Sequence, residues 1–316
     1  MLFVDLDKAL KTKIENVYVI GGEDAFLRNR ALNKIKKALD ISYIDLNSVV
    51  INGGNIDEII NACRVMPFMS KKRLVVAYEF YDNKNIDVIK QIEKLAQQYN
   101  DSCLIIVNSE MDKIAKAMGV VYVDCKKMDS NLLAQWVTAS AKNANKRITP
   151  LVVKKIVEYC NNDMSKIDSE TKKLNCFCED EITMEAVELI VVKDTDYAVY
   201  ALTNNIAEKN LKEALLVLWS LLSRGEEPTA LVSMMYSMFK RMFFSKNTTK
   251  SVEQTAKLLG VKEYAVQKAR ENAVKFGGIK LRKAMSLCLN ADEEMKTSNV
   301  SKNDRLELLV LQVVNL

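Results

Sequence analysis

A short apolar strand, two glycines and an amphipathic helix constrain this chain more than any other feature. Residues 17–20 are apolar and rich in β-branched side chains, which is typical of a buried strand. Gly21 and Gly22 end this strand, and apolar residues then recur at helical spacing up to Leu39. A strand, a glycine turn and a helix form the context in which helix N-termini bind phosphate. The segment therefore predicts an α/β domain built like a nucleotide-binding domain.

The residues that nucleotide chemistry needs are missing from this turn. A phosphate-binding loop reads G-x-x-x-x-G-K-[ST], in which the lysine reaches the phosphates and the hydroxyl group holds Mg²⁺. Glu23 and Asp24 instead place two carboxylates where phosphate would approach, and no Lys-Ser/Thr pair follows. We therefore predict a degenerate nucleotide turn at Gly21, Gly22, Glu23 and Asp24, in a domain that does not bind ATP. The alternative is an ordinary strand-to-helix turn of some other α/β domain.

The order of elements predicts an α/β region followed by an all-α region. Near-continuous apolar strands, separated by helices, are typical of a parallel sheet covered on both faces. We expect no strand after Cys125. The predicted strands cover residues 17–20, 49–52, 73–78, 103–107 and 120–123. The predicted helices between them cover residues 24–39, 56–65, 86–98 and 112–117.

The helical region divides into a small domain and a larger one. Together with the α/β region they predict three domains, over residues 1–125, 126–194 and 195–316. Helices of the small domain are expected over residues 131–143 and from Thr149, Asp163 and Thr183. Those of the larger domain are expected over residues 197–209, 211–223, 228–245, 252–259, 264–275, 279–295 and 304–314. We predict that these C-terminal helices, from about residue 195, form the assembly interface, because their apolar content exceeds what one helix can bury in its own bundle. Examples are Leu215, Leu216, Leu218, Trp219, Leu221 and Leu222.

The absence of histidine from all 316 residues excludes several kinds of site. Serine–histidine–aspartate and cysteine–histidine catalysis both need an imidazole base, and histidine is a common ligand of metals. The seven cysteines are odd in number and scattered, as is usual for reduced thiols. Cys176 and Cys178 form one close pair, which is a poor zinc site without a second pair. We predict no catalytic residue, no metal and no cofactor.

Hydropathy and charge limit the partners of the chain. No apolar stretch is long and uncharged enough to span a bilayer, and Asp5 and Asp7 interrupt the start where a signal peptide would be apolar. We therefore expect a cytoplasmic location and no membrane partner. Residues 195–316 hold 18 basic and 13 acidic residues, which accounts for the whole net charge of +5. This excess fits either a face toward nucleic acid or an ordinary solvated surface.

Three large apolar side chains and a proline occupy a junction between a helix and a strand. They are Met66, Pro67, Phe68 and Met69. Loops are normally polar and exposed, so apolar residues on a stiff turn predict a wedge that enters a pocket of a partner protein. The alternative is that Phe68 and Met69 fold back as a local core. The basic residues that follow are possible steering charges, namely Lys71, Lys72 and Arg73.

A second motif lies in the C-terminal region. Residues 255–261 followed by 264–269 are similar to a helix-turn-helix. A DNA-reading version would place polar residues at the start of its second helix. Here that start is Lys262, Glu263, Tyr264 and Ala265, with one acid and two bulky or apolar groups, which is a weak reading surface. The favoured interpretation is a helix–glycine–helix corner within a larger bundle.

Several stretches taken together resemble one family, the delta subunit of the bacterial DNA polymerase III clamp loader. Their order, their spacing and their span over nearly the whole chain carry the resemblance, since each stretch alone is unspecific. The stretches are residues 18–27, 66–76, 163–174 (with Asp163, Ile167, Glu170, Lys173 and Leu174), 225–228 with 239–241, 256–261 and 292–296.

The resemblance implies an AAA-type α/β domain without a P-loop, a helical lid and a helical collar domain that oligomerises. It also implies a subunit that binds no ATP, in agreement with the degenerate turn, and that opens the ring-shaped sliding clamp (the beta subunit). In the family a hydrophobic tip before the third strand does this, which here falls on residues 66–69. Phe68 matches the aromatic anchor, whereas Pro67 stands where some members have leucine.

The resemblance further implies partners and a process. The partners are the gamma/tau and delta-prime subunits of the clamp loader, and primed DNA through the assembled complex. The chain would be no enzyme by itself but a component of the DNA polymerase III holoenzyme, which carries DNA-directed DNA polymerase activity. Two other functions stay open on the residues alone. One is a helix-turn-helix DNA-binding regulator with an α/β sensor domain, and the other is an active P-loop-like NTPase or kinase.

Overall fold

The computed structural model describes residues 1–80, 86–109, 117–261 and 263–316. The chain forms two compact units. One comprises residues 1–137 with 164–169, and the other residues 138–163 with 170–316. The helix predicted over 112–117 falls, apart from Ala117, outside the described residues. The three predicted domain boundaries stay predictions.

A five-stranded parallel sheet organises the first unit. The strand order is β2-β3-β4-β1-β5, and every neighbouring pair is parallel. The five predicted strands are confirmed to within about one residue at their ends. The strands are β1 (Val17–Gly21), β2 (Ser48–Asn52), β3 (Arg73–Tyr78), β4 (Ser102–Asn108) and β5 (Val121–Asp124).

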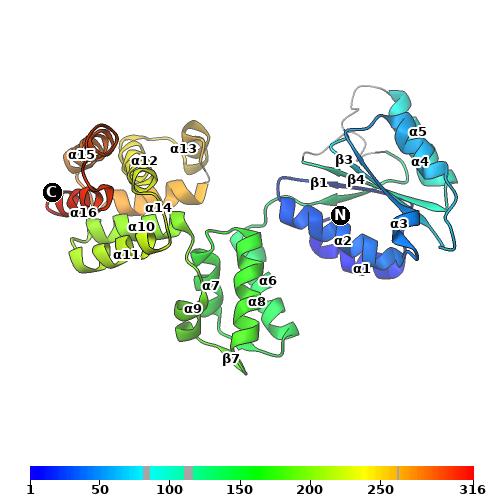
Figure 1. The fold of residues 1–316 in the computed structure, drawn as a ribbon, viewed down its shortest axis with the longest axis horizontal. Coiled ribbons are helices and arrows are strands. Elements are labelled where there is room, and N and C mark those ends of the chain that lie inside the picture. Colours follow the sequence, from blue (N-terminus) through cyan, green and yellow to red (C-terminus); the bar gives the residue numbers. More distant parts are fainter. Residues whose placement is uncertain (81–85, 110–116, 262) are drawn as a thin grey trace. The chain divides into compact units, whose positions relative to one another are not determined.

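Helices cover both faces of this sheet, which explains its near-continuous apolar strands. Alternate strand residues such as Val19, Val75 and Leu104 join one buried cluster with side chains of two helices on the same face. Figure 1 shows α1 and α2 on the opposite face. The covering helices are α1 (Leu6–Thr12), α2 (Ala25–Leu39), α4 (Ile56–Arg64) and α5 (Ile86–Gln98), of which α4 and α5 share the first face.

Two short helices of the first unit have no counterpart in the sequence prediction. They are α1 and α3 (Ile44–Asn47), and a 3₁₀ turn over Phe3–Asp5 precedes α1. Helices of one or two turns are marginal by themselves and form only because tertiary contacts hold them. Leu6 is fully buried, and Asp7 pairs with Lys34 of α2 at 2.6 Å. We conclude that α1 forms because it packs against α2, and not because of a local apolar periodicity.

The prediction that strands stop after Cys125 is wrong. A second, two-stranded parallel sheet joins β6 (Arg147–Ile148) and β7 (Glu181–Ile182). Strands of two residues carry no detectable alternation, so the sequence pattern gives no sign of them. The neighbouring helices are confirmed, and they are α6 (Ser130–Asn143), α7 (Pro150–Tyr159), α8 (Met164–Phe177) and α9 (Met184–Ile190).

In the described part of the chain seven further helices complete the second unit, and six of them share one core. The central helix is α12 (Pro228–Asn247), which packs against α10, α14, α15 and α16 and buries Phe239 completely. All seven were predicted to within three residues. The other six are α10 (Thr195–Ala207), α11 (Leu211–Ser223), α13 (Val252–Leu259), α14 (Glu263–Ala273), α15 (Gly278–Thr297) and α16 (Lys302–Val314).

Candidate protein-binding site

The segment Met66–Met69 lies at the edge of the large sheet where the parallel strands begin. It connects α4 to the start of β3, and the end of α3 leads directly into the neighbouring strand β2. Met66 is 76% exposed, Phe68 56% and Met69 71%, whereas Pro67 is half-buried. Exposed side chains of this size favour the wedge over the local core. We call residues 66–69 the tip.

A buried asparagine fixes the backbone of the tip. Asn47 is fully buried at the end of α3. Its Oδ1 accepts a hydrogen bond from the Phe68 amide at 2.7 Å, and its Nδ2 donates to the Phe68 carbonyl oxygen at 2.8 Å. The backbone of Phe68 is therefore held from both sides while its side chain points to solvent.

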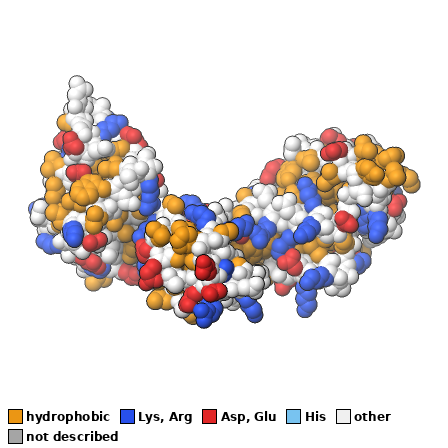
Figure 2. All heavy atoms as spheres, turned by 60° about the horizontal axis from the view of Figure 1, so that its bottom comes forward, with side chains coloured by type: hydrophobic (Ala, Val, Ile, Leu, Met, Phe, Trp, Pro, Cys, Tyr) orange, Lys and Arg blue, Asp and Glu red, His pale blue; other side chains and the backbone are white. Residues whose placement is uncertain are grey.

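Three exposed apolar residues that were not predicted from the sequence as site residues lie beside the tip. Tyr43, Ile44 and Leu46 begin and form α3, and they are 59%, 52% and 57% exposed. The rings of Tyr43 and Phe68 meet edge to face, with their centroids 6.4 Å apart. Figure 2 shows hydrophobic side chains gathered at this end of the α/β unit. The available signal was four large apolar residues among residues 41–46, between two predicted elements.

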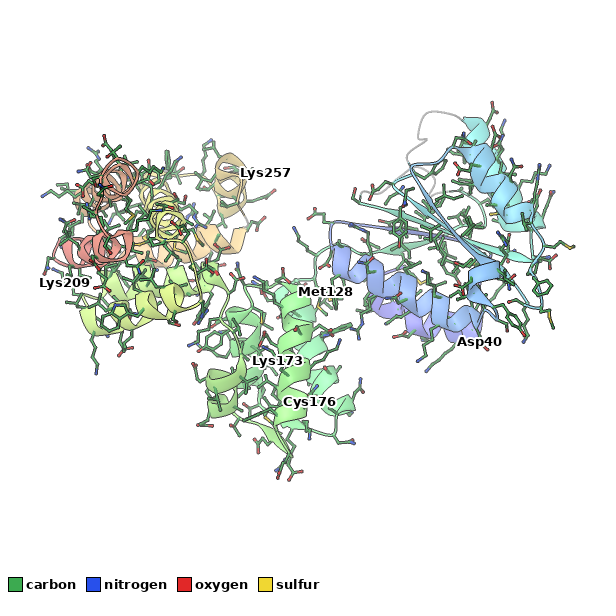
Figure 3. The ribbon with its side chains drawn as sticks, in the orientation of Figure 1. Asp40, Met128, Lys173, Cys176, Lys209 and Lys257 are labelled. Carbon is green, nitrogen blue, oxygen red and sulfur yellow. The ribbon has the colours of Figure 1, made fainter. Side chains whose placement is uncertain are left out.

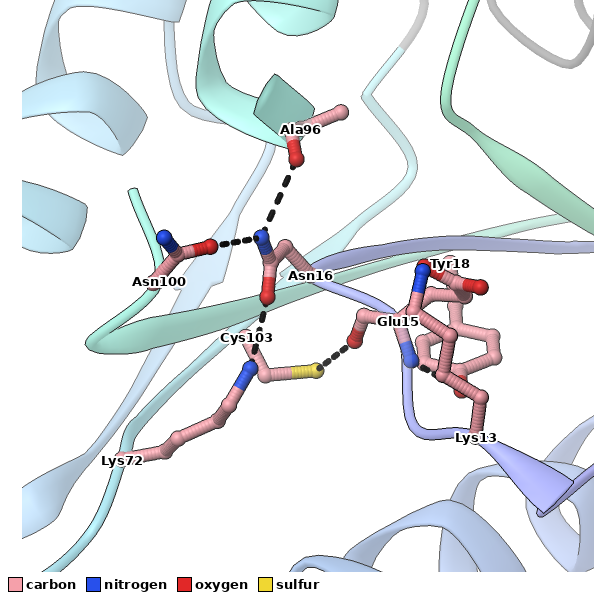
Figure 4. Close-up of polar contacts among 8 residues, drawn as sticks. All are labelled: Lys13, Glu15, Asn16, Tyr18, Lys72, Ala96, Asn100 and Cys103. Carbon is pink, nitrogen blue, oxygen red and sulfur yellow. Dashed lines mark hydrogen bonds and ion pairs between the residues drawn. The ribbon is translucent and has the colours of Figure 1, made fainter. Parts of the chain in front are cut away.

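Two of the three predicted steering charges are engaged within the unit itself. The Lys72 ammonium donates to Asn16 Oδ1 at 2.6 Å (Figure 4). The Arg73 guanidinium donates to the carbonyl oxygens of Leu46 at 2.8 Å and Ala62 at 3.1 Å. These contacts tie α3 and α4 to the sheet edge. Lys71 alone of the three is exposed rather than partly buried, so it remains the candidate for steering.

The degenerate nucleotide turn lies at the opposite edge of the sheet, where β1 ends. The Asp24 side chain caps α2 by accepting from the Leu27 amide at 3.1 Å, and Arg28 donates to the Gly22 carbonyl oxygen. Glu23 pairs with Lys127 at 3.2 Å. The helix N-terminus that would receive a phosphate therefore already holds a carboxylate of its own chain.

Four of the buried cysteines offer little reactivity. Burial raises the pKa of the Cys63, Cys103, Cys125 and Cys288 thiols to about 12, which keeps them neutral. Cys176 is exposed on α8 (Figure 3), and the seven cysteines, all within the described residues, form no disulfide. Among the described residues, no group of three or more His, Cys, Asp or Glu side chains is placed to hold a metal ion.

Among the residues that the structure describes, no helix combines the length and the apolar character needed to cross a membrane.

The second motif is a corner of the helical bundle, as the favoured interpretation expected. Gly260 ends α13 in the left-handed conformation with φ of 64°, and α14 begins at Glu263. Val266 and Ala273 of α14 are buried in the second unit, where α14 packs on α12. Lys262 lies outside the described residues. The apolar face of α14 is thus buried in its own bundle. This packing gives no specific support to the alternative function of a DNA-binding regulator.

The six apolar residues of α11 named above fall into three groups by burial. Leu218 and Leu221 are fully buried in the core of their own bundle, so this part of the apolar content that suggested an interface is absorbed within the unit. Leu215 and Leu222 are partly buried against the same core. The exposed members are Leu216 and Trp219, at 46% and 48%, and the indole of Trp219 donates to Glu307 of α16 at 2.6 Å.

Comparisons with known proteins identify one family over most of the chain. The family model "DNA polymerase III, delta subunit" matches residues 18–139, and "DNA polymerase III delta subunit, C-terminal domain" matches residues 196–313. The chain is 25% identical to DNA polymerase III subunit delta of Bacillus subtilis, over 98% of this chain and 96% of that protein. The solved structure of the Bacillus subtilis DNA clamp loader delta protein is similar in fold, with a TM-score of 0.79, 22% identity and coverage of 99% of this chain and 100% of that one. The chain therefore belongs to the DNA polymerase III delta subunit family.

Proposed function

We propose that this chain binds the sliding clamp through the tip and opens it for loading onto primed DNA. The observation that carries the proposal is an exposed apolar tip whose backbone is rigidly held at Phe68. An aromatic anchor with little freedom loses little entropy on binding, which is typical of an interaction hot spot. Membership in the delta subunit family supports the clamp as the partner.

Clamp opening of this kind needs no catalytic residue on the chain. The tip opens the ring if it binds the opened interface more tightly than the closed one. Shifting a two-state equilibrium from 1:99 to 99:1 takes a difference of roughly 10⁴ in affinity, or about 5.5 kcal/mol. A few hot-spot contacts supply energy of this order. ATP-binding gamma/tau subunits would then control when the tip is accessible.

The proposal is tested by capturing the partners of the full chain. Affinity purification from its source bacterium, followed by mass spectrometry, is expected to recover the clamp, the gamma/tau subunits and delta-prime. Recovery of transcription proteins or an operator fragment instead would contradict it. We also propose that the chain acts in the cytoplasm as a non-catalytic component of a holoenzyme with DNA-directed DNA polymerase activity.

The isolated chain is expected neither to bind nor to hydrolyse ATP. The Asp24 carboxylate occupies the N-terminus of α2 and would repel a phosphate, and the Lys-Ser/Thr pair that binds phosphate and Mg²⁺ is absent. Isothermal titration with Mg-ATP should give no heat of binding. The ATP-binding subunit of the same complex is the positive control, and a micromolar affinity of this chain would refute the prediction.

The exposed residues of α11 are proposed to contact neighbouring clamp-loader subunits. Trp219→Ala is expected to weaken co-assembly with these subunits about tenfold, because tryptophan is enriched among interface hot spots. Analytical gel filtration of the mixed subunits at falling concentration measures this. Leu151→Ala, at an exposed leucine of α7, is the matched control. Equal assembly by both variants would rule out this face of α11 as the contact.

A further inference from the structure

We propose that α3 and the tip form one preorganised binding surface, and that Asn47 is the positioning residue that holds the two together. This inference rests on the proposed function, since it takes the sliding clamp as the occupant of the whole surface. It adds Tyr43, Ile44 and Leu46 to the contact. Phe68 remains the anchor.

The hydrogen bonds of Asn47 carry the proposal. Besides its two bonds to the Phe68 backbone, its Nδ2 donates to the carbonyl oxygen of Ser42 at 2.8 Å and lies 3.3 Å from that of Tyr43. One buried amide therefore joins backbone groups on either side of the surface, separated by more than twenty residues of chain. A buried amide with all these partners satisfied fixes a single arrangement, whereas its loss would leave the Phe68 groups to be satisfied by water.

Backbone conformation gives a second, independent observation. Tyr43 and Met69 both have positive φ, of 50° and 49°, and both belong to this surface. The other non-glycine positions with positive φ in the described ranges carry Asp, Asn, Glu or Lys. A bulky side chain in this region costs free energy and persists only where the surroundings determine it, which is common at binding sites. Both residues nevertheless present their side chains to solvent.

The two segments also form a continuous apolar surface. The ring of Tyr43 meets that of Phe68, and Ile44 and Leu46 extend the exposed area along α3. Patches of this kind are uncommon on the surfaces of monomeric proteins and mark protein contacts. Because this surface is continuous with the tip, we take the same partner, the sliding clamp, to cover both. A clamp that receives Phe68 in a pocket also contacts the adjoining Tyr43.

Preorganisation predicts how Asn47 affects binding. The apparent affinity falls in proportion to the fraction of molecules whose tip has the binding conformation. Two hydrogen bonds to one residue are enough to change this fraction about tenfold. Asn47→Ala should therefore weaken clamp binding although Asn47 itself is buried and never touches the clamp.

The test measures hydrogen exchange and clamp affinity on the full chain. In the unmodified chain the Phe68 amide should be protected from exchange, despite its exposed side chain, because it donates to Asn47. In Asn47→Ala this protection should be lost, and the affinity for purified clamp in surface plasmon resonance should fall about tenfold. Fast exchange of the Phe68 amide in the unmodified chain, or unchanged affinity in the variant, would overturn the inference.

The chain contains a matched control for this substitution. Asn108 is also fully buried, and its side chain holds the backbone of Phe80 by the same pair of bonds, at 3.1 and 2.8 Å. It lies at the end of β4, on the sheet edge opposite the tip. Asn108→Ala should lower the melting temperature as Asn47→Ala does, but should leave the clamp affinity of the folded protein unchanged. A general loss of stability would instead lower both affinities alike.

A second variant keeps the inference testable if Asn47→Ala does not fold. Tyr43→Asn removes the ring but places a residue that tolerates positive φ, so the fold should be retained. Its clamp affinity should fall about fivefold, and an unchanged affinity would exclude α3 from the contact. In a double-mutant cycle, Asn47→Ala should cost little once Phe68 is alanine, because positioning acts through Phe68. If the unmodified chain does not bind the clamp at all, the proposed function fails, while the exchange experiment still decides the role of Asn47.

Discussion

Phe68→Ala is expected to weaken binding to the sliding clamp about thirtyfold and to leave the melting temperature unchanged. A hot-spot aromatic in a desolvated pocket typically costs ~2 kcal/mol or more when truncated, which corresponds to roughly thirtyfold in affinity. Phe68 is 56% exposed in the free chain, so its removal creates no cavity. Surface plasmon resonance gives the affinity, and calorimetry gives the melting temperature of the same sample.

Phe177→Ala is the matched control for this substitution. Phe177 ends α8 and is 53% exposed, close to the exposure of Phe68, but it lies outside the tip. Its variant should bind the clamp like the unmodified chain. The opposite pattern for Phe68→Ala, a lower melting temperature with clamp affinity preserved in the folded fraction, would show that Phe68 is a core residue. A buried Phe→Ala change costs about 3–5 kcal/mol of stability.

Two neighbours of Phe68 should respond differently. Met69→Ala should weaken clamp binding in the same direction but by less, since a flexible thioether adapts to a pocket. Lys71→Ala should mainly change the salt dependence of the association rate, because an exposed charge beside an interface steers the encounter more than it anchors the complex. Rates measured at several salt concentrations separate the two effects. A large rise in the dissociation rate of Lys71→Ala would instead make Lys71 an anchor.

Gly22→Ala is expected to lower the free energy of unfolding by about 3 kcal/mol, a large effect for the addition of one methyl group. Gly22 has a φ of 133°, a backbone conformation that residues with a side chain rarely adopt. A Cβ atom there would lie 2.4 Å from the carbonyl carbon of Cys125 and 2.7 Å from the amide nitrogen of Lys126. These are backbone atoms next to β5, so the clash cannot be relieved by turning a side chain. Urea denaturation measures the loss.

Gly53→Ala separates conformation from crowding. Gly53 also has positive φ, at 61°, but a Cβ atom there would meet nothing within 4 Å. Its substitution should cost only about 1 kcal/mol, the typical penalty for a left-handed residue. Equal losses in the two variants would show that the contact with residues 125 and 126 is not what requires glycine. A clearly larger loss for Gly22→Ala would show that packing against residues 125 and 126 preserves the turn, independently of any nucleotide.

The sequence determined most of the regular structure. Apolar periodicity, capping residues and helix-ending glycines predicted the five strands of the sheet and the long helices to within a few residues, because these signals are local. Very short elements were not predicted, because they are too short to show a local pattern. The two-residue strands β6 and β7 and the single turn of α3 exist only through contacts with distant parts of the chain.

The site divides in the same way. Residues 66–69 are conspicuous in the sequence because apolar side chains and a proline interrupt a junction, and the missing lysine of the glycine turn is equally plain. Tertiary structure alone decided that Lys72 and Arg73 are engaged internally and that Leu218 and Leu221 are core. It also brought Tyr43 and Asn47 to Phe68, because α3 and the tip precede the neighbouring parallel strands β2 and β3. Strand order is set by long-range pairing, and no local pattern within either segment records it.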